Sequence, residues 1–365
     1  METILVTGAM GQVGRRCAEI LLDRGRTVIA TDLHNNNTAA LAEELAQRQA
    51  RGRLIVSYVD LTDADAVRDL VTIHRPQAIA HLAGVLAPTS YRNPRVARKV
   101  NVGGTTHLVE AAKALPEPPL IILASSAAVY GSRNPYHYPE LITPDTPINP
   151  MDHYGEDKML AESVLRDSGL PHALLRLAGV VSPDGASSIN ADHLLLMRAI
   201  PSDNPLHSVH AHDVALAFAN AIDRMDAING KVLLIAGDDS HKHTNSRLQD
   251  DMMRAVGIGP LGPSAGLPGN PDDDRGWGPT GYFDTTEAQA LLDFQKHNWD
   301  QTVTWIADSQ AQLRPTLRLL SPVLRPAIRA ALAAQRRIEK RGPFADPWTF
   351  MSSKYGPDML AQSNF

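Results

Sequence analysis

Apolar positions in the first part of the chain fall into two alternating patterns. Short, nearly continuous apolar runs occupy residues 1–7, 26–31, 53–59, 77–83 and 120–124. Between them, apolar residues recur at helical spacing over 15–22, 39–50, 64–74 and 94–114. Buried strands that alternate with helices require a parallel sheet with helices on both faces. We therefore predict an α/β fold with a doubly wound parallel sheet.

The pattern is less regular beyond residue 150. We expect a helix from Tyr154, strands over 172–177 and 231–236, and helices over 284–292 and 300–313. Residues 257–281 are rich in Gly and Pro, which predicts a long loop, either a substrate wall or a plain surface excursion. We divide the chain into a sheet domain (1–180), a smaller C-terminal substrate-binding lobe interleaved with late sheet elements (181–313), and a helical C-terminal extension (314–365).

The first strand ends in a glycine-rich turn that opens a helix. Gly8, Gly11 and Gly14 would let a pyrophosphate approach backbone N–H groups at the start of that helix. The second strand ends in Asp32, whose carboxylate can accept both hydroxyls of an adenosine ribose and would repel a 2′-phosphate. The stretch predicts a Rossmann-type dinucleotide site that prefers NAD to NADP. The alternative is an ordinary glycine turn followed by a surface acid.

A second group of polar residues follows the fifth strand. Ser125 and Ser126 come directly after that strand, and Tyr154 and Lys158 share one face of the next helix. A phenol with its ordinary pKa near ~10 is too weak a base to take a proton from an alcohol at neutral pH. The charge of Lys158 should lower that pKa, and Ser126 should hold the substrate oxygen. An isolated Tyr-x-x-x-Lys pair is usually incidental, but the glycine turn, Asp32 and the serine strand occur here in chain order.

These motifs resemble the extended short-chain dehydrogenases, the NAD-dependent epimerase/dehydratase family, from residue 1 to about 310. The resemblance implies that Ser126, Tyr154 and Lys158 are catalytic, with Asn101 supporting a proton-relay water. It implies a substrate pocket lined by Ser125, Ser126, Tyr154 and Gly179. The NAD site that it implies consists of Gly8, Gly11, Gln12, Val13, Gly14, Asp32, Asp60, Leu61, Leu82, Ala83, Gly84, Tyr154, Lys158 and Pro183.

Three departures from the family pattern bear on the substrate. Gly179 stands where sugar-nucleotide relatives carry an Asn, and residues 206–214 include no Arg at the place that binds a diphosphate. Ala127 and Ala128 replace the Asp-Glu pair of the 4,6-dehydratases. These departures argue against a dehydratase and weaken the case for a sugar-nucleotide substrate.

We therefore expect an NAD-dependent oxidoreductase that transfers hydride between NAD and a secondary alcohol or ketone of a small molecule. The same-class alternative is an epimerase that oxidises and re-reduces a sugar or sugar nucleotide with tightly bound NAD. The alternative of another class is a non-catalytic NAD-sensing protein, which would not need Ser126, Tyr154 and Lys158. Relatives pair the helix over 94–114 and the catalytic helix with their symmetry mates, so the resemblance also implies a homodimer.

Composition limits the other partners. A net charge of −5 argues against nucleic acid. No apolar run is long enough to cross a bilayer and the first strand begins at once, so we expect a cytoplasmic protein. The single cysteine, Cys17, cannot form an intrachain disulfide. Several histidines suggest a metal site, but His210 and Asp213 match non-metal positions of the family, so we expect no metal; the histidines are His207, His210, His212, His241 and His243.

The extension is strongly basic at its start. Residues 314–341 include eight Arg or Lys against one acid, Glu339. Prolines at 315, 322 and 326 should break it into short helical pieces, of which 326–341 is the best candidate. Such a segment could lie on an anionic membrane, bind an acidic substrate or a second subunit, or pack its apolar stripe on the parent domain with its basic face in solvent. We expect the last arrangement, and a substrate less polar than a sugar nucleotide.

Overall fold

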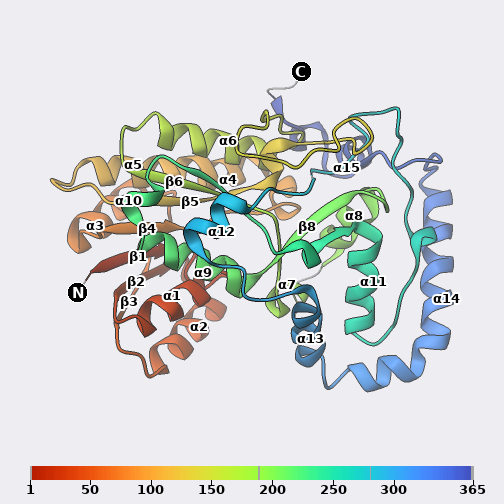
Figure 1. Cartoon of the computed structure of the whole chain (residues 1–365), viewed down its shortest axis with the longest axis horizontal. Coiled ribbons are helices and arrows are strands. Elements are labelled where there is room, and N and C mark those ends of the chain that lie inside the picture. Colours follow the sequence, from red (N-terminus) through yellow and green to blue (C-terminus); the bar gives the residue numbers. More distant parts are fainter. Residues whose placement is uncertain (1, 188–189, 280, 363–365) are drawn as a thin grey trace.

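The core of the computed structural model is a seven-stranded sheet with the order β3-β2-β1-β4-β5-β6-β9 (Figure 1). The structure describes residues 2–187, 190–279 and 281–362. Its strands all pair in parallel and are β1 Thr3–Thr7, β2 Thr27–Asp32, β3 Arg53–Tyr58, β4 Ala78–His81, β5 Leu120–Ser126, β6 His172–Leu177 and β9 Val232–Ile235. The predicted doubly wound sheet is confirmed, and its strand order reverses between β1 and β4.

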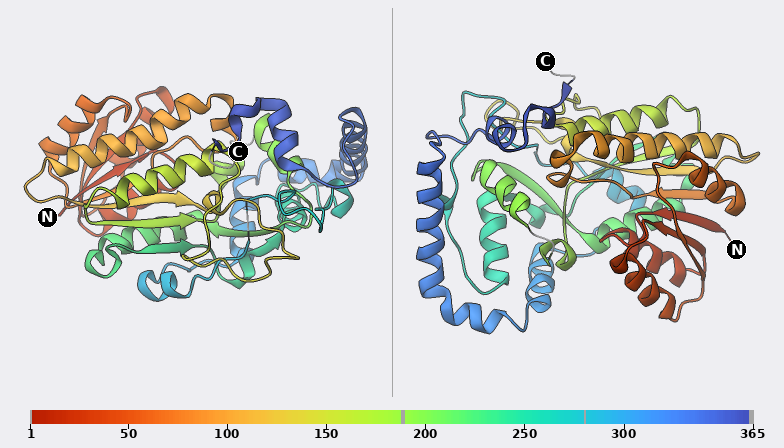
Figure 2. Two further views of the ribbon diagram at one scale, coloured as in Figure 1. Left: turned by 90° about the horizontal axis from the view of Figure 1, so that it is seen from above. Right: turned by 180° about the vertical axis from the view of Figure 1, so that it is seen from behind.

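Helices cover both faces of the sheet (Figure 2). On one face lie α1 Gly14–Asp23, α2 Asn36–Gln47, α9 Ala211–Ile222, α10 Met225–Ile228 and α12 Thr286–Leu292. The other face carries α3 Ala64–His74, α5 Gly104–Lys113 and α6 His153–Arg166. Side chains of β1 alternate between the two cores, since Ile4 and Val6 belong to the first and Leu5 to the second.

The predicted long helix over 94–114 is present with one irregularity. It consists of α4 Pro94–Arg98, a π-helical turn over Lys99–Gly103, and then α5. A π-helical turn inserts an extra residue and changes the direction of nearby side chains, and such turns are frequent at functional sites. Asn101 lies in the middle of it.

A smaller lobe adjoins the C-terminal edge of the sheet. A three-stranded sheet with the order β10-β8-β7 consists of β7 Gly179–Val181, β8 Pro205–His210 and β10 Lys242–Thr244. The helices of the lobe are α7 Pro183–Ser187, α8 Ala191–Ala199, α11 Asn245–Ala255 and α13 Trp299–Ser309. The described part of 257–281 is a loop with one short 3-10 turn, Pro263–Ala265, as predicted.

The extension differs from the prediction in two respects. First, α14 runs unbroken over Arg314–Ile338 with Pro322 and Pro326 inside it. Each internal proline removes only one backbone hydrogen bond, and the strong helix formers Leu, Ala and Arg dominate the rest of the segment. The prediction of separate pieces was therefore wrong.

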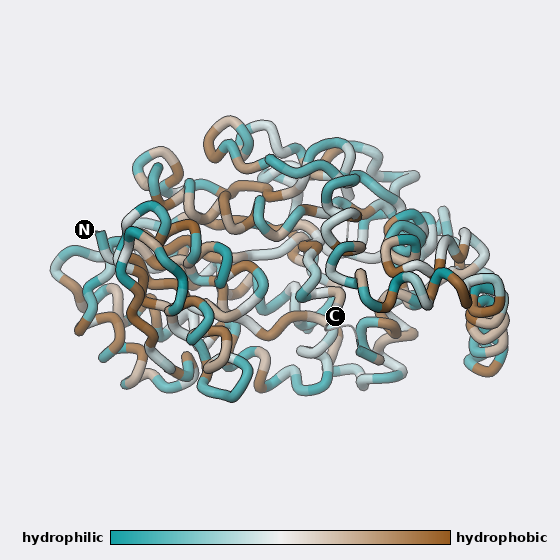
Figure 3. Tube along the Cα trace, turned by 90° about the horizontal axis from the view of Figure 1, so that it is seen from below, coloured by the Kyte–Doolittle hydropathy of each residue, from teal (hydrophilic) through white to brown (hydrophobic). Residues whose placement is uncertain are grey.

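Second, basic residues of α14 contact the rest of the protein as well as the apolar stripe. Arg329 and Arg336 donate to the carbonyls of Leu261 and Ala265 at 2.6 and 2.7 Å, so basic residues face the loop. Most of the apolar stripe is half-buried, namely Leu317, Leu324, Ile328 and Leu332. Leu319 and Val323, which lie outside that stripe, are exposed. Figure 3 shows apolar residues in this helix at one end of the molecule. Over the described residues, no helix is both long and apolar enough to cross a membrane.

Candidate active site

The glycine turn packs directly on the end of β4. Gly8 has a φ of +65°, and a Cβ there would lie 2.8 Å from backbone atoms of Ala83. A Cβ on Gly14 would overlap the carbonyl oxygen of Gly8. The turn therefore tolerates only glycine at both places, and this close approach brings the predicted residues Leu82 and Ala83 beside it.

Asp32 lies at the C-terminal end of β2 and contacts the same turn. Its two carboxylate oxygens accept hydrogen bonds from the N–H groups of Met10 and Leu33 at 2.9 and 2.8 Å. A carboxylate oxygen has a second lone pair, so each can also accept a ribose hydroxyl. A glycine cradle with an acid at this position fits a dinucleotide without a 2′-phosphate.

Most other residues predicted to bind the cofactor lie near the C-terminal ends of the strands or beside the glycine turn. Asp60 accepts from the N–H and hydroxyl of Thr62, both at 2.8 Å, and Leu61 is buried after β3. Val13 is buried at the start of α1. The side-chain oxygen of Gln12 accepts from Ser182 at 2.6 Å, next to Pro183 at the start of α7. The second lobe thus reaches the glycine turn.

The predicted catalytic residues come together at the ends of β5 and α6. The hydroxyl of Ser126 accepts from the N–H of Ala128 at 3.2 Å and is hydrogen-bonded to the phenol of Tyr154. Lys158 Nζ lies 5.9 Å from the centre of the Tyr154 ring and donates to the carbonyl of Ala124 at 2.8 Å. Asp152 caps α6 by accepting from the N–H of Gly155 at 2.7 Å, which fixes the first turn that carries Tyr154.

The pKa values of this group differ from the sequence expectation. Burial raises the pKa of Tyr154 to about 12, although the Ser126 hydrogen bond acts in the opposite direction. The expected lowering by Lys158 is not seen in the protein alone. Burial also lowers the pKa of Lys158 to about 8, against the charges of Asp157 and Glu162. At neutral pH Tyr154 is therefore a protonated phenol that can give a proton.

Asn101 positions the segment that leaves β4. Its side-chain oxygen accepts from the N–H of Val85 at 2.8 Å, and its amide donates to the carbonyl of Val85 at 3.1 Å. A Cβ on Gly84 would lie 3.1 Å from the Asn101 oxygen and 3.4 Å from Lys158 Nζ. Gly84 therefore lies next to both side chains, and Asn101 holds this stretch of chain beside Lys158.

Ser125 points away from Ser126. Its hydroxyl donates to Glu162 at 2.5 Å, on the α6 side of the sheet. Glu162 also accepts hydrogen bonds from Nε and Nη2 of Arg176 at 2.9 and 2.8 Å. Ser125, Glu162 and Arg176 are all buried. Burial alone would raise the pKa of Glu162, but its hydrogen bonds to Arg176 lower it. The structure thus gives the Ser125 hydroxyl a structural partner, and the sequence analysis missed this ion pair.

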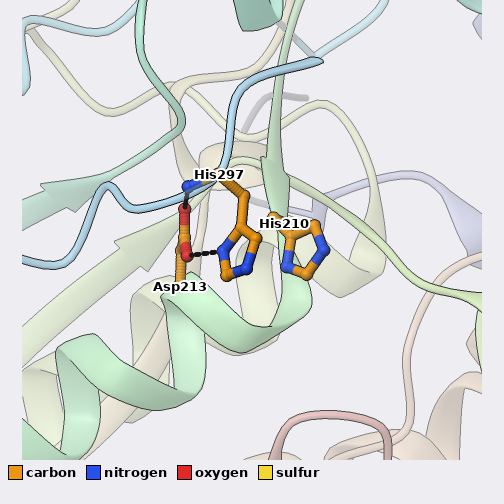
Figure 4. Close-up of side chains that lie close together, drawn as sticks. All are labelled: His210, Asp213 and His297. Carbon is orange, nitrogen blue, oxygen red and sulfur yellow. Dashed lines mark hydrogen bonds and ion pairs between the residues drawn. The ribbon is translucent and has the colours of Figure 1, made fainter. Parts of the chain in front are cut away.

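His210 and His297 stack ring on ring, so their nitrogen atoms do not point to one common metal position. His210, Asp213 and His297 lie close together (Figure 4), with candidate ligand atoms within 4.8 Å of one another. The rings of His210 and His297 are stacked at 4.0 Å and 9°, so their lone pairs lie in nearly parallel planes and do not meet. Asp213 accepts from His297 Nδ1 at 2.5 Å. This geometry joins α9 to the segment before α13.

Gly179, the remaining predicted substrate residue, is the first residue of β7 and pairs with Ser208. It is exposed and presents no side chain to a ligand.

Comparisons with known proteins show what this chain is similar to. A family model described as GDP-mannose 4,6 dehydratase matches residues 5–182. Over 170 residues the chain is 33% identical to UDP-glucose 4-epimerase 2 of Oryza sativa subsp. japonica. This alignment covers 46% of this chain and 40% of the relative. Over 167 residues it is 28% identical to D-erythronate dehydrogenase of Cupriavidus necator, and this alignment covers 45% of this chain and 49% of the relative. Residues 5–182 are thus similar to the extended short-chain dehydrogenases of the NAD-dependent epimerase/dehydratase family.

The extent of these matches is uneven. The chain spans less than half the length of these two curated relatives. The solved structure of UDP-glucose 4-epimerase from Bifidobacterium longum, in complex with NAD+ and UDP, has a TM-score of 0.67 and 22% identity to this chain. It covers 86% of this chain and 99% of its own, so this chain has residues that the epimerase fold lacks.

Proposed function

We propose that this protein is an NAD-dependent oxidoreductase that interconverts a secondary alcohol and a ketone of a small molecule. The observation that carries the proposal is the contact of Ser126, Tyr154 and Lys158 beside a glycine cradle and Asp32. Bound NAD would supply or accept hydride at the substrate carbon. Gly8, Asp32 and Lys158 would hold it, and the names of solved relatives with NAD support this choice of cofactor.

The residues have distinct roles in the proton transfer. In ketone reduction, Tyr154 donates its phenolic proton to the substrate oxygen as the carbonyl carbon accepts hydride. Ser126 donates a hydrogen bond to the same oxygen, which strengthens as negative charge develops there. The charge of Lys158 stabilises the phenolate that remains. Oxidation uses the same groups in reverse, with the proton of the alcohol passing to Tyr154.

An epimerase is the second candidate, because named relatives are UDP-glucose 4-epimerases. An epimerase returns the hydride to its own substrate and leaves NAD unchanged, whereas a dehydrogenase accumulates NADH. Incubating the protein with NAD and a panel of hydroxy compounds and UDP-sugars, while following NADH absorbance and sugar isomers, separates the two. Gly179 and the lack of an Arg over 206–214 favour the dehydrogenase.

We further propose a homodimer through α4–α5 and α6. Val96 on α4 is an exposed apolar residue on this surface, and relatives pair these helices as a four-helix bundle. Light scattering at micromolar concentration should give twice the chain mass; a clean monomer would contradict the proposal.

A further inference from the structure

A small cavity lies where the C-terminal extension meets the smaller lobe. It has a volume of about 10 Å³, room for one water-sized group, and it is partly open to solvent. Three arginines line it, namely Arg198 in the last turn of α8, Arg336 in the last turn of α14, and Arg341 just after that helix. The rest of the lining is Leu332 and the loop over 265–267, so no acid lines this cavity among the described residues.

Arg341 lacks an acceptor for part of its guanidinium group. Among the described residues, its Nη2 is buried and makes no hydrogen bond. The guanidinium carbon lies over the Phe350 ring, 4.0 Å from its centre. Such a contact attracts the positive charge but offers the N–H groups no oxygen acceptor. Because a buried donor without a partner is costly, an acceptor from outside the chain would stabilise this arrangement.

Two further cations near Arg341 share one carboxylate. Arg198 and Lys354 lie over the same aromatic ring, at 5.8 and 5.3 Å from its centre. Glu339 forms ion pairs with both of them, at 2.6 and 3.6 Å. One negative charge thus serves two positive ones, and Arg341 is a third positive charge beside them.

Arg336 adds a fourth positive charge. It donates to the backbone carbonyls of residues 265 and 264 at 2.7 and 3.0 Å, which are neutral acceptors. A guanidinium has five N–H donors, so these two bonds leave donors for another acceptor. The planar guanidinium fork matches the oxygen atoms of a phosphate or a carboxylate.

The pKa of Arg341 reflects the excess of positive charge. Burial lowers this pKa most, and the charges of Arg198 and Arg336 lower it further. The two acids whose charges act in the opposite direction, Glu339 and Asp346, do not restore its ordinary value. A negative charge at the cavity would stabilise the cation.

We propose that Arg198, Arg336 and Arg341 bind a phosphate group, with one oxygen in the cavity and the others at its mouth. A phosphate group carries about two negative charges and several acceptor oxygens, which suits three arginines that no acid separates. Free phosphate and phosphate monoesters share this chemistry. The three arginines are not among the predicted catalytic or cofactor residues, so the site is additional to the proposed function. Bound phosphate would join α8, the loop over 265–267 and the end of α14.

Calorimetric titration of the full chain tests the site. The protein is saturated with NAD, so that the glycine turn is not free to bind phosphate, and sodium chloride keeps the ionic strength constant. Inorganic phosphate and glycerol 3-phosphate are titrated separately. The wild type should bind at least one of them, and the tighter ligand shows whether the site takes free phosphate or a monoester.

Substitutions locate the binding. Arg341→Gln should weaken it by at least about tenfold, because charge-assisted hydrogen bonds are lost. Arg337→Gln is the matched control, since it removes the same charge from an exposed residue that does not line the cavity, and it should bind like the wild type. Arg341→Lys keeps the charge but not the fork, so it should weaken binding by about threefold or more even if Arg341→Gln does not fold.

Hydrogen exchange of the wild type gives a readout without substitution. Phosphate should slow amide exchange over 263–267 and 335–342 and leave residues 8–14 of the glycine turn unchanged. Three results would each overturn the proposal: no binding of either compound by the wild type, equal binding by the Arg341 variants and Arg337→Gln, or slower exchange confined to other segments.

Discussion

Lys158 Nζ lies 5.9 Å from the centre of the Tyr154 ring and donates to the carbonyl of Ala124 at 2.8 Å. The lysine is therefore fixed by the strand that also carries Ser126, so β5 and α6 set the geometry of all three side chains. Its buried position lowers its pKa to about 8. Below that pH the ammonium is charged, and above it the charge is progressively lost.

The first prediction follows from the loss of the Lys158 charge as pH rises. For ketone reduction, kcat/KM should be flat between pH 6 and 7 and fall as pH rises through about 8, because Lys158 loses the charge that stabilises the phenolate. Lys158→Arg keeps the charge at all these pH values and should remove the fall, even if its rate is lower. Steady-state kinetics across pH checks this. An identical fall in both proteins would show that another group titrates.

The two serines should respond differently to removal of the hydroxyl. Ser126→Ala should lower kcat by about 100-fold with little change in stability, because it removes a donor to the developing charge. Ser125→Ala should leave most of kcat but lower the free energy of unfolding by about 1–3 kcal/mol, since Glu162 loses a buried partner. Kinetics and denaturant unfolding of both variants separate the roles. A large kcat loss in Ser125→Ala with unchanged stability would give Ser125 a place in the pocket.

Cofactor preference should depend on Asp32. Its carboxylate should bind the adenosine ribose hydroxyls of NAD and repel the phosphate of NADP, so the wild type should bind NAD more tightly. Asp32→Asn keeps an oxygen that can accept from a backbone N–H. It should reduce the difference in affinity between NAD and NADP, because it removes the repulsion of the NADP phosphate. Calorimetry with both cofactors measures it, and equal affinities in the wild type would remove this role.

The buried Glu162–Arg176 pair should make stability depend on acid. Arg176 holds the pKa of Glu162 below its ordinary value of 4.5 despite burial. The contribution of the ionised carboxylate is therefore present above pH 4.5 and lost as pH falls through the lower pKa of the folded state. Glu162→Gln should be less stable at pH 7 by about 3–5 kcal/mol and lose less on acidification. Denaturant unfolding between pH 7 and 3 checks both, and parallel curves would contradict the role of this pair.

The sheet and the cofactor edge could be predicted because their signals are local. Each apolar run lies between two helical segments, and Gly8, Gly14 and Asp32 follow directly after strands. The closeness of Ser126, Tyr154 and Lys158 could also be predicted, since Tyr154 and Lys158 are one helical turn apart. The opposed directions of Ser125 and Ser126 were not predicted, because the strand was expected to end at residue 124 and both serines were placed in the pocket. Strand β5 includes both serines, and adjacent residues of a strand point to opposite faces.

Other features depend on contacts that no local pattern shows. Trp348 and Met359 reach the surroundings of Tyr154 across about half of the chain, and sequence spacing does not record such packing. The prolines of α14 were given too much weight, because the loss of single backbone hydrogen bonds did not outweigh a long run of good helix formers. The raised pKa of Tyr154 arises from burial, which the sequence does not show.

The central claim is that Tyr154 transfers the substrate proton in an NAD-dependent reaction. The most direct measurement is NADH formation by wild type and Tyr154→Phe with the same secondary alcohol, alongside calorimetric binding of NAD to both. We predict that Tyr154→Phe binds NAD with nearly unchanged affinity and loses at least about 100-fold in kcat. Turnover by Tyr154→Phe at the wild-type rate would contradict the account.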